Sequence, residues 1–294
     1  MVTIFALGAA LLYGSADFLG GVATRLSRVA SVLPLSAGAG VVVVLGAALL
    51  SGEPFRSAGL GWGLAGGAMG GIGLIIFYAG LAAGPMSVVA PVSALAATVL
   101  PVGVALGEGE RASPIVDIGA LLCLTAIVLV SSAESREFSA RRGRAGLRDR
   151  LAASGFHGRA VAYGLAAGTL FGLFFTFMRV AAQGGTLWPA TAARVAGLAV
   201  ILLAAAVTRS RPVFGRAGAR LLLATAGSGV LDASANVCYI LATRSGLFGL
   251  AVVLTSLYPG ITVLLARLGL GERLRPAQKA GLLLAGLGVV LVTA

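Results

Sequence analysis

The sequence predicts an all-α integral membrane protein of about ten transmembrane helices, and its composition and long apolar runs are the observations that predict it. Hydrophobic residues make up 58% of the 294 positions and charged residues only 11%, which is more apolar surface than one soluble core could bury. A helix needs about 20 apolar residues to cross a bilayer. Apolar runs of that length occupy 2–22, 31–50, 60–82, 86–106, 114–132, 159–182, 188–208, 218–242, 247–268 and 276–293. This pattern argues against a water-soluble enzyme.

The apolar runs fall into two groups of five that share a sequence pattern. Residues of the first group recur 162 positions later without a gap: Gly84, Gly107, Gly109, Glu110, Arg111, Pro114 and Gly119 return as Gly246, Gly269, Gly271, Glu272, Arg273, Pro276 and Gly281. Because each repeat holds an odd number of spans, the second must enter the membrane upside down relative to the first. We therefore expect two inverted five-helix repeats, 1–132 and 159–294, joined by an Arg-rich linker, 133–158.

Basic residues predict how the chain is oriented. They gather after the first, fifth, seventh and ninth spans, at Arg25 and Arg28, at Arg136, Arg141, Arg142, Arg144, Arg148, Arg150 and Arg159, at Arg209, Arg211, Arg216 and Arg220, and at Arg273, Arg275 and Lys279. The even-numbered loops hold little beyond Arg56, Arg111 and Arg244. Since Lys and Arg remain on the cytoplasmic side, the odd loops and the linker are predicted to be cytoplasmic and both termini outside, in a multi-pass protein of the cell inner (plasma) membrane. The net charge of +12 then comes from basic residues that mark the cytoplasmic loops. No nucleic acid partner is expected.

Ionisable residues inside the predicted spans point to transport. Inverted repeats suit alternating access around a site near the middle of the membrane, and a carboxylate at that depth costs at least about 2.5–3.5 kcal/mol unless it meets water, a partner or a proton. Asp17 lies one turn after Tyr13, and Asp232, Asn236 and Tyr239 share one helix face. Asp232, near the middle of its span, and Asp17 are therefore candidates for substrate binding and coupling. A hydrogen bond between helices or a permanent pair with an arginine is the alternative explanation for Asp232.

Aromatic and basic residues of the sixth and seventh spans are further candidates. Phe171, Phe174, Phe175 and Met178 follow the spacing of a buried helix face, and the phenyl rings are also suited to hold a ring or an organic cation. We include Phe171 and Phe175 among the substrate-binding candidates. Arg179 and Arg194 could snorkel to the interface, pair with acidic residues or bind a substrate carboxylate.

Two prolines interrupt apolar spans and predict hinges. Pro91 and Pro259 each remove a backbone hydrogen bond and can bend their helices. Ser256 and Tyr258 precede the second bend, where exposed backbone carbonyls and hydroxyl groups are candidate substrate contacts; a static packing kink is the alternative. Glu110 and Glu272 lie near helix starts, where we expect them to cap helices or pair with arginines.

Several of these residues together resemble the EamA-type drug/metabolite transporter superfamily. The resemblance rests on the paired boxes Gly109-Glu110-Arg111 and Gly271-Glu272-Arg273, and on the segments 13–18 (Tyr-Gly-Ser-Ala-Asp-Phe) and 256–259 (Ser-Leu-Tyr-Pro). It implies ten helices in two inverted five-helix repeats, a central cavity formed mainly by the first four helices of each half, and a last helix in each half used for packing or dimer contacts. Such transporters are usually drawn with both termini in the cytoplasm, which is opposite to what the arginines predict here.

We therefore expect a secondary active transporter that exports or exchanges a small organic solute, such as a cationic drug, an amine, an amino acid or a related metabolite. Coupling to a proton is one option, membrane lipid is the surrounding partner, and a monomer and a homodimer are both compatible with the sequence. The alternatives are a passive channel, a lipid scramblase and a scaffold. No catalytic motif, cofactor or metal site is expected, because no span contains a histidine and the two cysteines, Cys123 and Cys238, lie within spans as small apolar residues.

Overall fold

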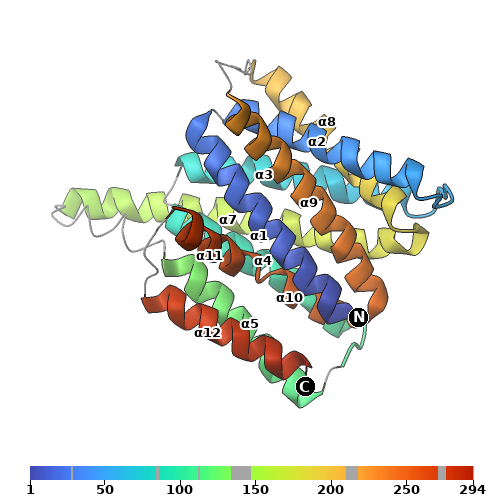
Figure 1. Ribbon diagram of the computed structural model, residues 1–294. Helices are drawn as coiled ribbons and strands as arrows, with labels where there is room; N and C mark the ends of the chain where they lie inside the picture. Colours follow the sequence, from blue (N-terminus) through green and yellow to red (C-terminus); the bar gives the residue numbers. More distant parts are fainter. Residues whose placement is uncertain are drawn as a thin grey trace.

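The computed structural model describes residues 1–27, 29–83, 86–111, 113–133, 147–209, 218–270 and 276–293. These residues form helices joined by short connections, with no strand among them (Figure 1). The helices are α1 Val2–Leu26, α2 Val29–Leu50, α3 Leu60–Ala83, α4 Met86–Gly107, α5 Pro114–Ala133, α7 Leu147–Ala181, the 3₁₀ turn η1 Ala182–Gly184, α8 Leu187–Val207, α9 Ala219–Ser245, α10 Phe248–Thr255, α11 Tyr258–Leu270 and α12 Pro276–Thr293.

The helices confirm the predicted fold class of a multi-span α-helical membrane protein. Every predicted apolar run falls on a helix. Seven segments of the described chain are long and apolar enough to cross a bilayer, with α10 and α11 counted together as Phe248–Gly269. Three shorter apolar helices lie at Val92–Gly107, Pro114–Leu129 and Pro276–Leu291. The structure therefore supports a multi-span membrane protein. The number of ten spans stays a prediction.

The structure departs from the predicted boundaries in two places. Helix α7 begins at Leu147, inside the segment 133–158 that the sequence assigned to a linker, because Leu, Arg and Ala are good helix formers even without a lipid-facing pattern. The remainder of the predicted linker, 134–146, lies outside the described residues. The predicted ninth span is two helices, α10 and α11, separated at Ser256 and Leu257.

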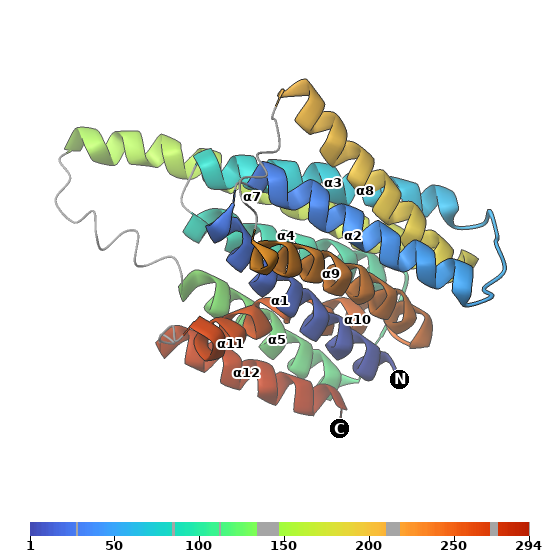
Figure 2. The ribbon, with the colours of Figure 1, turned by 45° about the horizontal axis from the view of Figure 1, so that its top comes forward.

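Glycines bring the long helices into close contact. The main packing pairs are α1 with α9, α3 with α7 and α8, α4 with α7, and α5 with α12 (Figure 2). A Cβ atom added to Gly67 of α3 would lie 2.0 Å from the backbone oxygen of Ala193, and one added to Gly168 of α7 would lie 2.4 Å from that of Ser93. Only a residue without a side chain permits these approaches, which are typical of close packing between membrane helices.

Both termini lie at the same end of the molecule, which we call the termini side; the linker side is where α5 ends and α7 begins (Figure 1). Contacts between distant segments tie the termini side together. The backbone N–H groups of Thr186 and Leu187 donate to Glu53 Oε1 at 2.9 and 3.1 Å, which caps the start of α8 from the α2–α3 connection. The side chain of Val2 contacts the end of α9 at Gly246.

Candidate substrate-binding cavity

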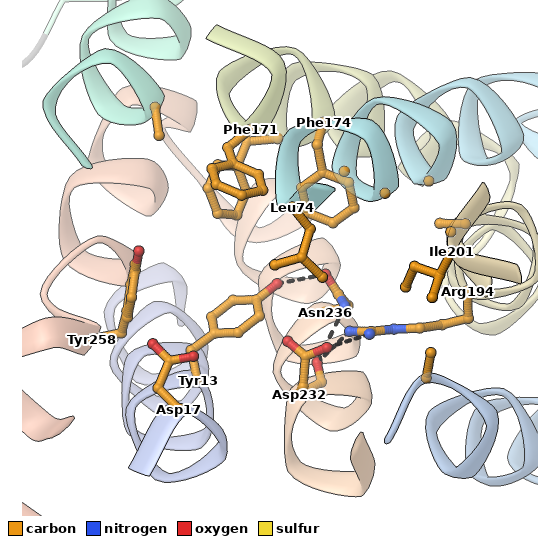
Figure 3. A pocket seen from close by; sticks show the side chains of 18 of the residues that line it. Tyr13, Asp17, Leu74, Phe171, Phe174, Arg194, Ile201, Asp232, Asn236 and Tyr258 are labelled. Carbon is orange, nitrogen blue, oxygen red and sulfur yellow. Dashed lines mark hydrogen bonds and ion pairs between the residues drawn. The ribbon is translucent and has the colours of Figure 1, made fainter. Parts of the chain in front are cut away.

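A cavity of about 250 Å³ lies in the middle of the helix bundle (Figure 3). Its lining comes from α1, α2, α3, α4, α7, α8, α9 and the first residue of α11, and ten lining residues belong to each half of the chain. The last helix of each half, α5 and α12, contributes no lining residue among those described. The resemblance implied the same arrangement, in which the first four helices of each half form the cavity and the last helix of each half does not.

Most of the residues predicted to bind substrate meet in this cavity. The eight that line it are Tyr13, Asp17, Phe171, Phe175, Arg194, Asp232, Asn236 and Tyr258. They come from five helices that are far apart in the sequence, so their convergence is a property of the fold. That these residues bind substrate stays a prediction.

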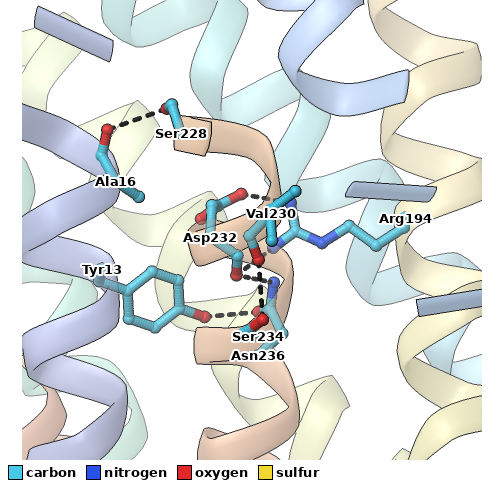
Figure 4. Close-up of polar contacts among 8 residues, drawn as sticks. All are labelled: Tyr13, Ala16, Arg194, Ser228, Val230, Asp232, Ser234 and Asn236. Carbon is cyan, nitrogen blue, oxygen red and sulfur yellow. Dashed lines mark hydrogen bonds and ion pairs between the residues drawn. The ribbon is translucent and has the colours of Figure 1, made fainter. Parts of the chain in front are cut away.

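A polar network connects α1, α9 and α8 across the cavity wall (Figure 4). The hydroxyl group of Tyr13 donates to Asn236 Oδ1 at 2.5 Å, and the Asn236 amide donates to the backbone oxygen of Asp232 at 3.2 Å. Arg194 forms an ion pair with the Asp232 carboxylate through one guanidinium nitrogen, and its other terminal nitrogen donates to the Asp232 backbone oxygen at 2.6 Å. Both ends of the guanidinium group are therefore engaged by the same residue.

Asp17 is the second carboxylate of the cavity wall and differs from Asp232. Its side chain is exposed in the cavity, and no described residue gives it a hydrogen bond or an ion pair. In Figure 3 it lies between Tyr13 and Tyr258, away from Arg194. Asp17 is therefore a carboxyl group of the cavity wall that has no partner among the described residues.

Aromatic rings form much of the remaining wall. The rings of Phe171 and Phe174 from α7 face the cavity opposite Tyr13 (Figure 3). Tyr13 packs edge-on against Phe175, with 6.4 Å between ring centroids, and lies 6.1 Å from the ring of Tyr258. The predicted stripe on α7 is thus divided: its phenylalanines line the cavity, whereas Met178 is fully buried beneath it.

A cluster of buried side chains lies next to the cavity on the termini side. Met178 lies one turn beyond Phe175 along α7, Tyr239 lies one turn beyond Asn236 along α9, and both pack with Phe248 at the start of α10; all three side chains are buried. We call this group of side chains the termini-side cluster. On the linker side, the buried cluster among the described residues is smaller and consists of Ala23, Val32 and Ala224.

Comparison with protein families finds a match in the second half of the chain. The family model described as the EamA-like transporter family matches residues 158–294. This part of the chain is an EamA-like transporter domain. The match supports, for this part of the chain, the resemblance seen in the sequence.

Solved structures extend the likeness to the whole chain at the level of the fold. A solved structure known only as "Crystal structure of protein" superposes with a TM-score of 0.78 at 20% sequence identity, covering 99% of this chain and 98% of that chain. At that identity the likeness shows a shared fold alone. No curated protein matches the sequence at a significant level.

Three residues predicted to bind substrate lie outside the cavity. Tyr239 is fully buried, and its hydroxyl group donates to the backbone oxygen of Phe175 at 3.0 Å. Ser256 is buried and accepts a hydrogen bond from Thr98 Oγ1 at 2.9 Å. Arg179 forms an ion pair with Glu108 and lies 4.5 Å from the centroid of the Phe248 ring. All three hold helices together around the cavity instead of facing into it.

The two predicted hinges differ. Helix α4 runs through Pro91 without a break, whereas the helix that contains Pro259 is interrupted immediately before it. At that interruption the N–H of Leu257 donates to the oxygen of Leu254 and the N–H of Gly260 donates to that of Leu257, as in a tight turn. Movement at either proline stays a prediction.

The first Gly-Glu-Arg box fastens the two halves to each other. Gly109 has a backbone φ of +82°, which favours glycine. Glu110 Oε2 accepts the N–H of Gly249 at 3.1 Å, which caps the first turn of α10 as expected for an acidic residue near a helix start. The second box, Gly271-Glu272-Arg273, lies outside the described residues.

Sequence reasoning missed the small residues of the cavity wall. Gly67, Gly70, Gly71 and Gly197 line it together with Ala37, Leu74, Ser93, Ala94, Ala97, Ala193 and Ile201. The one signal for them in the sequence is the glycine spacing on α3, which is also the pattern of close helix packing. Gly67 and Gly71 serve both purposes, because close packing against α8 and an open wall both require the absence of a side chain.

Proposed function

We propose that this protein is a secondary active transporter of a small organic solute and that the central cavity is its substrate site. The observation that carries the proposal is a cavity lined by equal numbers of residues from the two halves of the chain, with the buried termini-side cluster next to it, which in our proposal is a barrier on that side. A permanently open channel lacks such a barrier. A transporter needs one, because its site must face one side of the membrane at a time.

Inverted symmetry of the two halves supports this proposal. Helices α4 and α10 begin at Met86 and Phe248, and α5 and α12 begin at Pro114 and Pro276; both pairs of starts are 162 residues apart. The packing of the two halves corresponds in the same way. Helix α1 packs along α9, and their counterparts α7 and α3 pack along each other. Helices α1 and α7 run in opposite directions (Figure 1). Two such halves can exchange conformations, which would open the cavity to the other side.

In our proposal the termini-side cluster and the Arg179–Glu108 pair form the gate that closes this state. The pair joins the end of α7 to the end of α4, and its side chains are 32% and 50% exposed. An exposed ion pair contributes only about 0–1 kcal/mol. A contact of that strength is suited to a gate, because opening the termini side breaks it at little cost.

The arginines of the odd loops orient this state. If those loops are cytoplasmic, as positive charge predicts, the closed termini side faces outward and the cavity is loaded from the cytoplasm. Export or exchange is then the direction that we propose. Of the two carboxylates predicted to couple transport to a proton, Asp17 is the one available, because Asp232 is held by Arg194.

Side-specific labelling of a cavity cysteine tests alternating access. Cys123 and Cys238 are replaced by alanine, and Ala37→Cys, on the cavity wall, is introduced in vesicles of known orientation. A membrane-impermeant thiol reagent should label this cysteine faster from the linker side than from the termini side. Adding Glu108→Gln should raise labelling from the termini side at least threefold, because the gate is weakened.

Leu121→Cys, whose native side chain is 63% exposed on α5 away from the cavity, is the matched control and should stay unlabelled from both sides. Labelling of Ala37→Cys from one side only, with and without Glu108→Gln, would contradict the proposed transport cycle.

A further inference from the structure

We propose that the cavity selects a small monovalent organic cation, with Asp17 as the group that binds its positive charge. This inference rests on the proposed function and names the substrate class for the same cavity. It follows from which charged side chains of the cavity wall have an ion-pair partner and which have none among the described residues.

The described cavity wall holds one more carboxyl group than it holds cationic groups. Its charged side chains are Asp17, Asp232 and Arg194. Arg194 is satisfied twice by Asp232, at its carboxylate and at its backbone oxygen, so this pair is neutral as a unit. The carboxyl group without a described partner is that of Asp17. When it is ionised in an apolar bundle, such a group is costly, and a bound cation relieves that cost.

The same geometry disfavours a substrate carboxylate. Arg194 is the cation of the described wall, and its side chain is only 14% exposed. An anionic or zwitterionic substrate would have to displace Asp232 from it, which would leave a second carboxylate unpaired in the cavity. Amino acids, with their carboxylate group, therefore meet a barrier that amines do not.

The aromatic residues near Asp17 complete a site for an amine with an apolar body. Tyr13 and Tyr258 flank the carboxylate (Figure 3), and the electron-rich faces of such rings attract cations. Phe171 and Phe174 offer apolar surface farther along the wall. The cavity volume of about 250 Å³ is slightly below the range of about 300–1,000 Å³ of sites for drug-sized ligands. A molecule of one ring and a short amine chain fits this description.

Four phenyl compounds of similar size and different charge test the substrate class. Phenethylamine is a cation at neutral pH, phenylacetate an anion, phenylalanine a zwitterion and phenylethanol neutral. Binding to the purified full-length protein is measured by thermal stabilisation and by titration calorimetry. We expect saturable binding of phenethylamine, and at least tenfold weaker binding of the other three.

Variants of Asp17 assign the effect to that residue. Asp17→Asn should weaken phenethylamine binding at least tenfold, Asp17→Glu should restore most of it, and Asp117→Asn, which makes the same change at an exposed position on α5, should leave it unchanged. The melting temperature of each ligand-free variant shows whether it is folded.

Equal or tighter binding of phenylalanine or phenylacetate, undiminished binding by folded Asp17→Asn, or no saturable binding of phenethylamine would each overturn the proposal. None of these results bears on transport itself, which the side-specific labelling of Ala37→Cys decides. Failure of the substrate class and failure of the proposed function are therefore distinguishable.

Discussion

Asp17 and Asp232 are two carboxylates on the wall of one cavity, but the fold treats them in opposite ways. Asp232 is bound by Arg194, and its backbone oxygen also accepts the amide of Asn236, which in turn accepts the hydroxyl group of Tyr13. Asp17 has no such partner among the described residues and faces the cavity. The difference teaches that a charged residue inside the membrane can either stabilise the fold or bind a ligand. Its hydrogen-bond and ion-pair partners show which of these two roles it has.

Loss of the Asp232 carboxylate should have the largest effect on stability. Asp232→Asn leaves the Arg194 guanidinium without its counter-charge while its side chain is only 14% exposed. Breaking a fully buried pair costs about 3–5 kcal/mol, and because the cavity leaves the Asp232 side chain 39% exposed, we expect about 2 kcal/mol. Chemical unfolding in detergent measures this, and an unchanged free energy of unfolding would show that the pair contributes nothing.

Removing both partners of the pair should be milder than removing one. In the double variant Arg194→Gln/Asp232→Asn no unpaired charge remains, so we expect it to recover about 1 kcal/mol relative to Asp232→Asn. A double-mutant cycle on the free energy of unfolding gives the coupling directly. Additive losses from the two single changes would contradict an interaction between them.

Loss of one neutral hydrogen bond in the network should cost less again. Tyr13→Phe removes the bond to Asn236 Oδ1 but keeps the ring that packs on Phe175 and Tyr258. The expected loss is about 1 kcal/mol, seen as a small fall in melting temperature. A loss as large as that of Asp232→Asn would mean that Tyr13 holds the whole network in place.

Neutralising Asp17 should have the smallest effect on stability. Asp17→Asn removes no ion pair or hydrogen bond of the described structure. The free energy of unfolding should change by no more than about 0.5 kcal/mol, as for the exposed control Asp117→Asn. Severe destabilisation would make Asp17 a structural residue and remove the contrast with Asp232.

The sequence predicted the helices better than the contacts among them. Every apolar run falls on a helix because backbone polar groups have no other partners in lipid, and hydrophobicity alone therefore locates most of the structure. The shared faces of Tyr13 with Asp17 and of Asp232 with Asn236 were also predictable, since they depend only on helical spacing.

What could not be predicted depends on how helices pack. Helical spacing placed Tyr239 on the same face of α9 as Asp232. That face extends past the cavity toward the termini side, where Tyr239 is buried. Nothing in the sequence shows that Arg194 of α8 reaches Asp232 of α9 while Arg179 reaches Glu108. As a result Asp232 was the leading candidate in the sequence, whereas in the structure Asp17 is the acid of the cavity wall that has no partner among the described residues.

Transport by Asp17 variants tests the contrast between the two acids most directly. Proteoliposomes loaded with unlabelled phenethylamine are diluted into the labelled amine, and counterflow is followed for the unsubstituted protein, Asp17→Asn and Asp117→Asn. The account predicts saturable counterflow for the unsubstituted protein and for Asp117→Asn, and its loss in an Asp17→Asn protein of unchanged melting temperature. Counterflow by Asp17→Asn at the rate of the unsubstituted protein would contradict the assignment of Asp17 to the ligand.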